Sequence, residues 1–386
     1  MKKYLFSMAA VALMAAPVLT SCDDDDDVED LSPEELAIAS MDCTPSTQSA
    51  WGNYMRIVAN LLVSDAQTLN DNWNTQADGK TVSYAEYFKS LKGLEAAQQI
   101  ADGCYDIANE VGEAKIGDPL GLYEKGATNK ALFAVESWFS WHSRDDYSNN
   151  ILSIRNSLFG TLDGTESSKS LAAAVKAVKP TVYAETVAAI TAAYSAIQAI
   201  PQPFRSNINS TEAKLAQVAC AALGELLHGN FKSALESVDD ATLKTAVAEY
   251  VDSVVIPTYA NLLSGNKALQ TAVVAFQENP SDDAFAACAK AWLAARQPWE
   301  TSEAFLFGPV ADLGLDPNMD SWPLDLTGIN NILTSGNYDE LNWSGNYKEK
   351  DENIEAAQAL RGFHTLEFLV FKDGEARTIV SVTATE

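Results

Sequence analysis

Residues 180–200 read PTVYAETVAAITAAYSAIQAI, and this stretch indicates the fold class of the whole chain. Its apolar residues recur at helical spacing, because Ile190 is followed by Ala193, Tyr194 and Ile197 at i+3, i+4 and i+7. That period places them on one face of a helix, where they can be buried together. We therefore expect a helix over these residues.

The same 3.6-residue period continues on both sides of this stretch. It predicts further helices over residues 50–72, 84–111, 129–141, 145–159, 210–235, 240–263, 267–276 and 282–307. Only the tail after Lys372 is β-branched enough to suggest a strand, and a single strand has no partner here. The sequence therefore predicts an all-α protein.

The length of 386 residues favours two domains over one. Residues 199–209, AIPQPFRSNIN, carry two prolines between two strong helical patterns and are the candidate boundary. We expect two bundles of four-helix type, over residues 32–200 and 201–386. Residues 308–350 contain one expected short helix, and irregular stretches of this length are usually functional.

The charge balance excludes one class of partner. The chain has 53 acidic and 26 basic side chains, which gives a formal net charge of −27. Nucleic-acid binding depends on basic side chains that displace counterions from phosphates. Nucleic acid is therefore not an expected partner.

The N-terminus has the pattern of an export signal. Two lysines precede an apolar stretch too short for a comfortable membrane span, and Leu-Thr-Ser then leads to Cys22. This resembles a bacterial lipobox, which implies a signal peptide over residues 1–21 and a diacylated Cys22 as membrane anchor. An ordinary signal peptide with Cys22 present by chance is the alternative.

Residues 22–31 contain an unbroken run of five aspartates and should form an extended, solvated tether. The run also resembles the acidic signal of surface-exposed lipoproteins of Bacteroidetes, and a simple spacer is the other interpretation. We expect an outer-membrane lipoprotein, on the cell surface or the periplasmic face.

The remaining cysteines lack metal-site spacing. Cys220 and Cys288 lie in Ala-rich helical patterns, where buried free thiols are expected. A disulfide between Cys43 and Cys104 is compatible with export, although the sequence alone does not decide it.

Residues 351–371, DENIEAAQALRGFHTLEFLVF, read as one helix whose second half is apolar around most of its circumference. His364 and Glu367 lie one turn apart within that buried half. A buried ionisable pair needs hydrogen bonds, mutual pairing or a metal. Gly362, expected inside the helix, suggests close approach of a neighbour or ligand. A His–Glu hydrogen bond in the core and a metal site both fit this pattern.

The G-x-H-x-x-E pattern at residues 362–367 resembles the signature of the imelysin family. Residues 299–309, WETSEAFLFGP, and 322–325, WPLD, resemble the segment that leads into it. The resemblance implies two helical bundles with the functional site at their interface, and a role in iron uptake. Only 19 residues follow Glu367, so the chain reads as a circularly permuted member.

A metal site at that interface is the functional expectation, with His364, Glu367 and Glu303 as ligands. Arg296 and Glu300 are spaced i, i+4 and can form an ion pair, and Trp299 beside them reads as a packing residue. No H-E-x-x-H zinc motif is present, so a His2Glu zinc site would need a distant histidine, His142 or His228.

We therefore expect a metal cofactor, iron rather than zinc, and a protein that binds this metal or an iron-containing ligand. Iron-uptake proteins are the expected partners. Two rival functions remain. One is a zinc peptidase acting on exported polypeptides, because relatives have been classed as metallopeptidases. The other is an adhesin-like module in which the His–Glu pair only supports the core.

Overall fold

The computed structural model describes residues 30–76 and 81–381. The predicted signal peptide, Cys22 and the whole run of five aspartates lie outside the described residues. Helices make up most of the fold and strands almost none of it, so the all-α prediction is confirmed. The described strands, β1 (Phe371–Lys372) and β2 (Glu375–Ala376), form an antiparallel hairpin of two residues per strand, which begins just before the predicted tail.

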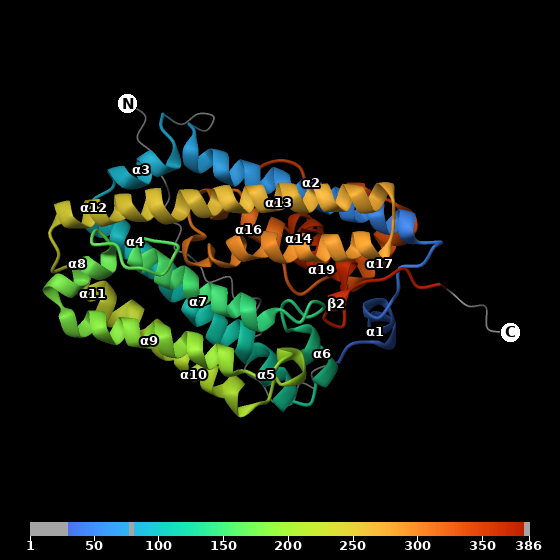
Figure 1. The fold of residues 1–386 in the computed structure, drawn as a ribbon, viewed down its shortest axis with the longest axis horizontal. Coiled ribbons are helices and arrows are strands. Elements are labelled where there is room, and N and C mark those ends of the chain that lie inside the picture. Colours follow the sequence, from blue (N-terminus) through green and yellow to red (C-terminus); the bar gives the residue numbers. More distant parts are fainter. Residues whose placement is uncertain (1–29, 77–80, 382–386) are drawn as a thin grey trace.

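One layer of the molecule is built from four helices (Figure 1). These are α2 (Gln48–Asn74), α13 (Ile256–Glu278), α14 (Asp282–Glu300) and α19 (Gly362–Val370). α13 packs against both α2 and α14, and α19 lies against α2 and α14.

The second layer also contains four long helices. These are α4 (Gly93–Glu110), α7 (Ser143–Phe159), α9 (Pro180–Ala199) and α10 (Thr211–Leu226). α9 packs against α7 and α10, and α4 packs against the same two helices from the other side. α14 contacts α7, so the two layers meet where the predicted motifs lie.

Shorter elements connect these helices. The α-helical ones are α1 (Pro33–Ala39), α3 (Tyr84–Ser90), α5 (Asp118–Glu124), α6 (Thr128–Phe133), α8 (Leu171–Val178), α11 (Lys232–Leu235), α12 (Asp240–Tyr250), α15 (Pro309–Asp312), α16 (Leu315–Asp320), α17 (Leu326–Ser335) and α18 (Glu352–Gln358). π-Helical turns occur at Val111–Gly117, Leu227–Phe231 and Val251–Val255, and 3-10 turns at Phe204–Ser206, Glu303–Phe305 and Tyr338–Leu341.

Both layers combine helices from the two halves of the chain. α2 lies with α13 and α14, whereas α10 lies with α9 and α4. The division into residues 32–200 and 201–386 stays a prediction. What the contacts establish is that each layer needs both halves of the sequence.

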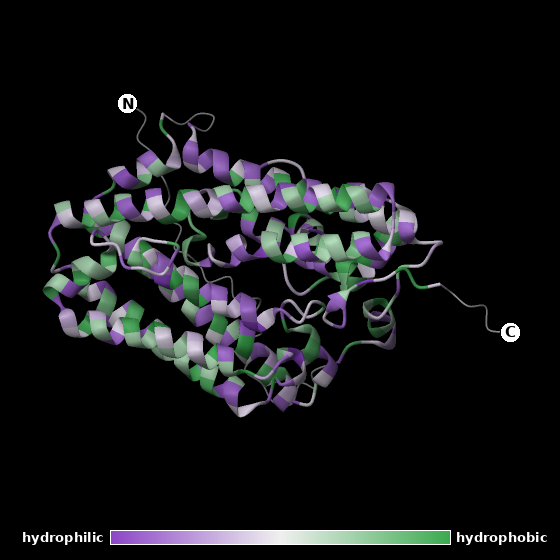
Figure 2. Ribbon diagram, viewed as in Figure 1, coloured by the Kyte–Doolittle hydropathy of each residue, from purple (hydrophilic) through white to green (hydrophobic). Residues whose placement is uncertain are grey.

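Local sequence explains where several helices begin. Side-chain oxygens accept a hydrogen bond from a backbone N–H of the first turn and so replace a missing intrahelical partner. Such caps are provided by Ser32, Ser83, Ser170, Ser210, Asp239 and Ser281. Figure 2 shows hydrophilic residues along the outer side of α2, as expected for a helix buried on one face.

The prediction of one helix over 351–371 was wrong. α18 ends at Gln358 and α19 begins at Gly362, whose φ of +93° is incompatible with the middle of a helix. The predicted close approach is confirmed, because a Cβ at Gly362 would lie 2.5 Å from the carbonyl oxygen of Met319. This glycine therefore marks a helix start pressed against α16.

Two further features of the core bear on earlier expectations. Cys43 and Cys104 are both buried free thiols, so the disulfide between them is not formed. Cys220 and Cys288 are buried thiols, as expected.

Within residues 30–76 and 81–381, no helix has the length and apolar character needed to cross a bilayer.

Candidate metal centre

The predicted site residues lie where the two layers meet. From the first layer come the C-terminal end of α14, the turn Glu303–Phe305, α16 and α19. The second layer provides α7 and the segment before it. Pro298 lies within α14, two residues before Glu300, near the end of the helix that carries several of the charged groups.

His364 lies at the centre of this region and is fully buried. Its Nδ1 is 3.1 Å from Oε2 of Glu367, and its Nε2 is 3.2 Å from Oδ1 of Asp320. Burial and the neighbouring Arg296 cation lower the pKa of His364, but the two carboxylates outweigh them and raise it to about 9. The imidazole is therefore cationic at neutral pH.

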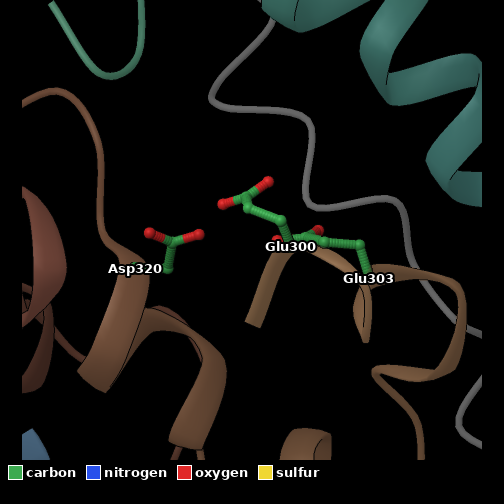
Figure 3. Close-up of side chains that lie close together, drawn as sticks. All are labelled: Glu300, Glu303 and Asp320. Carbon is green, nitrogen blue, oxygen red and sulfur yellow. The ribbon is translucent and has the colours of Figure 1, made fainter. Parts of the chain in front are cut away.

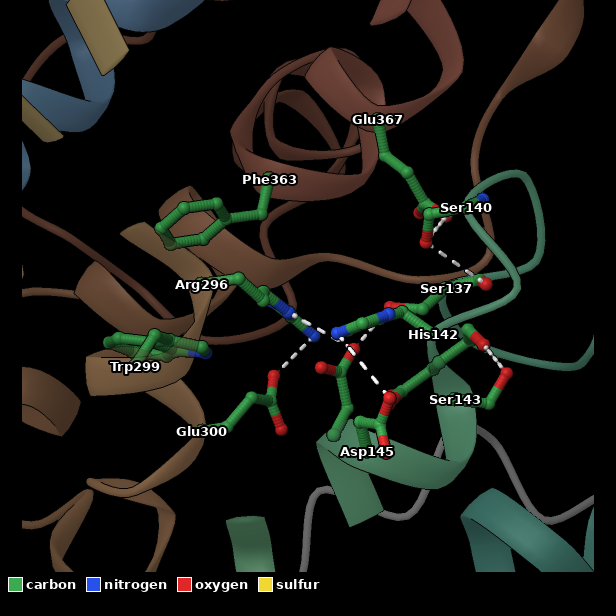
Figure 4. Close-up of polar contacts among 12 residues, drawn as sticks. Ser137, Ser140, His142, Ser143, Asp145, Arg296, Trp299, Glu300, Phe363 and Glu367 are labelled. Atoms are coloured by element: carbon green, nitrogen blue, oxygen red, sulfur yellow. Dashed lines mark hydrogen bonds and ion pairs between the residues drawn. The ribbon is translucent and has the colours of Figure 1, made fainter. Parts of the chain in front are cut away.

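Glu367 faces away from Asp320, toward the segment that precedes α7. Its Oε1 accepts hydrogen bonds from the backbone N–H groups of Phe139, at 3.0 Å, and Ser140, at 2.8 Å. The Ser140 hydroxyl donates a third bond to the same oxygen, at 2.8 Å. Figure 4 shows Glu367 and Ser140 meeting in this way.

Arg296 is a buried cation surrounded by carboxylates (Figure 4). The predicted i, i+4 ion pair with Glu300 is confirmed, with Nη2 and Oε1 2.5 Å apart. Arg296 also pairs with Asp320 and, at 3.5 Å, with Asp146 on α7. These contacts hold Arg296 charged in the core, since a buried guanidinium requires carboxylate partners.

Three carboxylates come close enough together to share one ion. One oxygen each from Glu300, Glu303 and Asp320 lies within 4.8 Å of the others (Figure 3). Asn150 donates to Oε2 of Glu300 at 2.6 Å, and Trp299 donates its indole N–H to Oδ2 of Asp320 at 2.6 Å. Trp299 thus orients a candidate ligand, a role beyond the packing that the sequence predicts.

Glu303 differs from its neighbours because it lacks a partner. Glu303 is a buried residue with an exposed fraction of only 6%. Among the residues that the structure describes, no hydrogen bond or ion pair reaches its carboxylate, which faces Glu300 and Asp320. Burial raises the pKa of Glu303 far above its ordinary value. The nearby Lys115 ammonium opposes this increase, and the Glu300 carboxylate adds to it.

Further acidic groups surround the three carboxylates. Burial raises the pKa of Glu300 to about 8, although the neighbouring Arg296 cation acts to lower it. Burial and Asp320 raise the pKa of Asp316 to about 7. Burial also opposes ionisation of Asp320, but Arg296 and His364 overcome it and hold the pKa of Asp320 well below its usual range. Asp320 is therefore the most firmly ionised carboxylate of the set.

Lys115 adds a cation from the second layer. Its ammonium lies 2.8 Å from Glu136 and 3.5 Å from Glu110, on a π-helical turn that continues α4. Such turns recur at functional sites. Two carboxylates thus face Lys115 here.

The buried centre holds more carboxyl groups than cationic side chains. Five buried carboxyl groups, of Asp146, Glu300, Glu303, Asp320 and Glu367, lie with the cations of Arg296 and His364, and the Lys115 ammonium also acts on Glu300 and Glu303. Uncompensated buried negative charge is costly unless a proton or a metal ion offsets it. The carboxylate oxygens of Glu300, Glu303 and Asp320 form a donor set that suits a hard divalent cation.

The sequence-based ligand set is only partly brought together. Glu303 joins Glu300 and Asp320, while His364 and Glu367 form a separate pair that touches Asp320. Sequence reasoning missed Asp320 and Asp316. Their i, i+4 spacing on a short helix just before Trp322 was the available signal, since it places both carboxylates on one face.

The two distant histidines have other neighbours. Nε2 of His142 lies 3.6 Å from Asp145, one turn along the same segment. The His228 ring packs on Tyr105, with the ring centroids 4.7 Å apart. Neither of these contacts joins a ring to His364.

Comparison with known proteins identifies relatives of this chain. The chain is similar to a crystal structure of an imelysin peptidase from Bacteroides ovatus, with 48% sequence identity and a TM-score of 0.86. The match covers 89% of this chain and 100% of the Bacteroides ovatus chain. Iron-regulated protein A of Synechococcus elongatus is 32% identical over 123 residues, which are 32% of this chain. The match spans only 30% of that relative's length.

The sequence profile of the imelysin family matches residues 24–229 and 255–384. These ranges include both motif blocks on which the resemblance was recognised, whereas the circular permutation stays a prediction. The chain belongs to the imelysin family.

Proposed function

We propose that this protein binds a metal ion, iron in preference to zinc, between its two helical layers, and that it serves iron uptake or homeostasis. The unpartnered, buried carboxylate of Glu303 carries the proposal. It faces two further carboxyl groups, of Glu300 and Asp320, in a centre that holds more carboxyl groups than cationic side chains. A bound cation would supply the missing compensation.

Glu300, Glu303 and Asp320 are the proposed ligands, with His364 beside Asp320. Oxygen ligands suit iron and other hard cations, whereas structural zinc sites are dominated by cysteine and histidine. The name of the cyanobacterial relative, iron-regulated protein A, supports iron.

Metal analysis tests this proposal directly. Wild-type protein purified without chelator and loaded with Fe²⁺ under anaerobic conditions should carry about one ion per chain. Glu303→Gln should lose it, because a neutral amide replaces the carboxylate while keeping its size. Glu225→Gln, at an exposed position, is the matched control and should bind like the wild type. Equal metal content in wild type and Glu303→Gln would refute the site.

A peptidase is the second candidate, supported by the name of the Bacteroides relative. Hydrolysis would need a metal-activated water and a base. Glu300, whose pKa is raised to about 8, is the candidate base and would be free to accept a proton at alkaline pH. Chelator-sensitive cleavage of an unfolded protein substrate, abolished by Glu300→Gln, would establish this activity. Retention of cleavage in that variant would exclude Glu300 as the base.

We also propose that the protein is an outer-membrane lipoprotein anchored through Cys22, on the cell surface or the periplasmic face, and that it works with iron-uptake proteins. Two or more acyl chains suffice for stable anchoring. Cys22→Ser should release the protein from the membrane fraction without unfolding it. Protease treatment of intact cells separates the two faces: cleavage indicates the surface, and full protection the periplasm.

A further inference from the structure

The segment between α6 and α7, residues 134–142, crosses from the second layer to α19; we call it the strap. Its backbone is held in an unfavourable shape. Ser137 has φ of +51° and Trp141 has φ of +59°, although neither is a glycine. Left-handed conformations of such residues persist only where surrounding contacts enforce them. Contacts with the surrounding residues therefore hold the strap in this shape.

Glu367 provides the central contact of the strap. Oε1 of this buried carboxylate accepts the N–H groups of Phe139 and Ser140 together with the Ser140 hydroxyl, at 2.8–3.0 Å. Two successive backbone N–H groups form a concave site that favours a negative charge. Glu367 thus occupies the strap much as a bound anion would.

The other oxygen of Glu367 connects the strap to the metal centre. Oε2 lies 3.1 Å from Nδ1 of His364, and Nε2 of the same ring lies 3.2 Å from Asp320. A carboxylate that receives the Nδ1–H of a histidine fixes the ring orientation and the direction in which Nε2 points. The chain of contacts therefore runs from the strap through Glu367 and His364 to a proposed metal ligand.

The strap touches the charged centre at two more places. The Ser137 hydroxyl donates to Asp146, which pairs with Arg296. Glu136, the preceding residue, pairs with Lys115 at 2.8 Å. Movement of the strap would therefore displace charges on both sides of the centre.

We infer that Glu367 is a positioning residue, which binds the strap and orients His364 toward Asp320, rather than a metal ligand. This inference rests on the proposed function for its metal arm only. Four donors already surround the two oxygens of Glu367, so direct ligation would require it to leave the strap. The expectation from sequence, in which Glu367 itself binds the metal, is the competing arrangement.

Hydrogen exchange of the metal-free protein tests the strap contact without any metal. Glu367→Gln keeps the side-chain size but replaces the charged acceptor, so the amides of Phe139 and Ser140 should exchange faster than in the wild type. Glu249→Gln is the matched control, because that carboxylate also accepts a serine hydroxyl, from Ser167, far from the strap. Unchanged exchange of the strap amides in Glu367→Gln would overturn the inference.

Mn²⁺ titration followed by electron paramagnetic resonance provides the second arm. Glu367→Gln should still bind one ion per chain, with affinity reduced roughly 10- to 100-fold, the usual effect of removing an outer-shell partner. Complete loss of binding in Glu367→Gln, with binding retained in the wild type, would identify it as a ligand and overturn the inference. Absence of binding by the wild type would instead refute the proposed function, and the exchange experiment would still decide whether Glu367 holds the strap.

Discussion

Gly362 shows how one residue fixes the position of the motif helix. Its φ of +93° and the Met319 carbonyl, 2.5 Å from where a Cβ would stand, both exclude a side chain. Without this close contact α19 could not approach α16, and His364 would not reach Asp320. The glycine of the G-x-H-x-x-E pattern thus acts through backbone packing.

Substitution of this glycine should therefore be costly. We expect Gly362→Ala to lower the free energy of unfolding by about 1–3 kcal/mol, from backbone strain and the clash with α16. Urea denaturation measures this. Gly121→Ala is the control, because Gly121 lies in α5 with no atom within 4 Å of its would-be Cβ. That variant should be neutral or slightly stabilised, and an equal loss in both variants would contradict our explanation.

At this scale the sequence indicated His364, Glu367 and the close approach at Gly362, because burial and spacing are local properties. It did not indicate the partners. The hydrogen bonds of Glu367 come from residues more than 220 positions away, at Phe139 and Ser140, and no local pattern encodes them. Asp320 was missed because a short helix of six residues has too few positions to show a period.

At the scale of elements, the helix break predicted between residues 263 and 267 is absent. α12, a π-helical turn and α13 instead continue from Asp240 to Glu278. Gly265 explains the difference, because a Cβ there would stand 3.0 Å from the Cα of Ala295 on α14. The glycine permits close helix packing and does not end the helix.

Enlarging this residue should separate the two helices. We expect Gly265→Val to destabilise the protein by about 1–3 kcal/mol through overpacking against α14. Thermal unfolding followed by circular dichroism measures the change. Ala192→Val is the control, because it introduces the same β-branched side chain on the exposed face of α9. This variant should change stability little. A harmless Gly265→Val would show that the α13–α14 contact can relax.

For the whole molecule, the sequence predicted the helical class but not how the helices associate. α2 packs against α13, about 200 residues later, and this pairing depends on complementary surfaces that periodicity does not reveal. The proposed metal centre depends on this pairing too, since its charged groups come from both layers. The expectation of a site between two bundles came from the family resemblance and not from composition or period, and it stays a prediction.

The charged centre should make stability depend on pH. The pKa of His364 is about 9 in the folded state, above its ordinary value of 6.5. Its contribution to the free energy of unfolding is therefore complete below pH 6.5 and is lost as pH rises through 9. The pKa values of Glu300 and Asp316 are raised to about 8 and about 7, so both groups stay protonated to higher pH in the folded state than in the unfolded state. All three effects lower the free energy of unfolding as pH rises from about 5 to 9.

Urea denaturation of the metal-free protein across that pH range checks this expectation. Glu300→Gln should show a shallower decline, because its amide mimics the protonated acid and does not titrate. A metal-free wild type that gains stability toward pH 9 would contradict the assigned pKa directions.

The most direct test of the metal centre is anomalous diffraction at the iron edge from crystals loaded with Fe²⁺ under anaerobic conditions. The account predicts one strong peak within coordinating distance of Glu300, Glu303 and Asp320, with Glu367 still bound to the strap. A peak elsewhere, or none in crystals of protein that binds iron in solution, would contradict it.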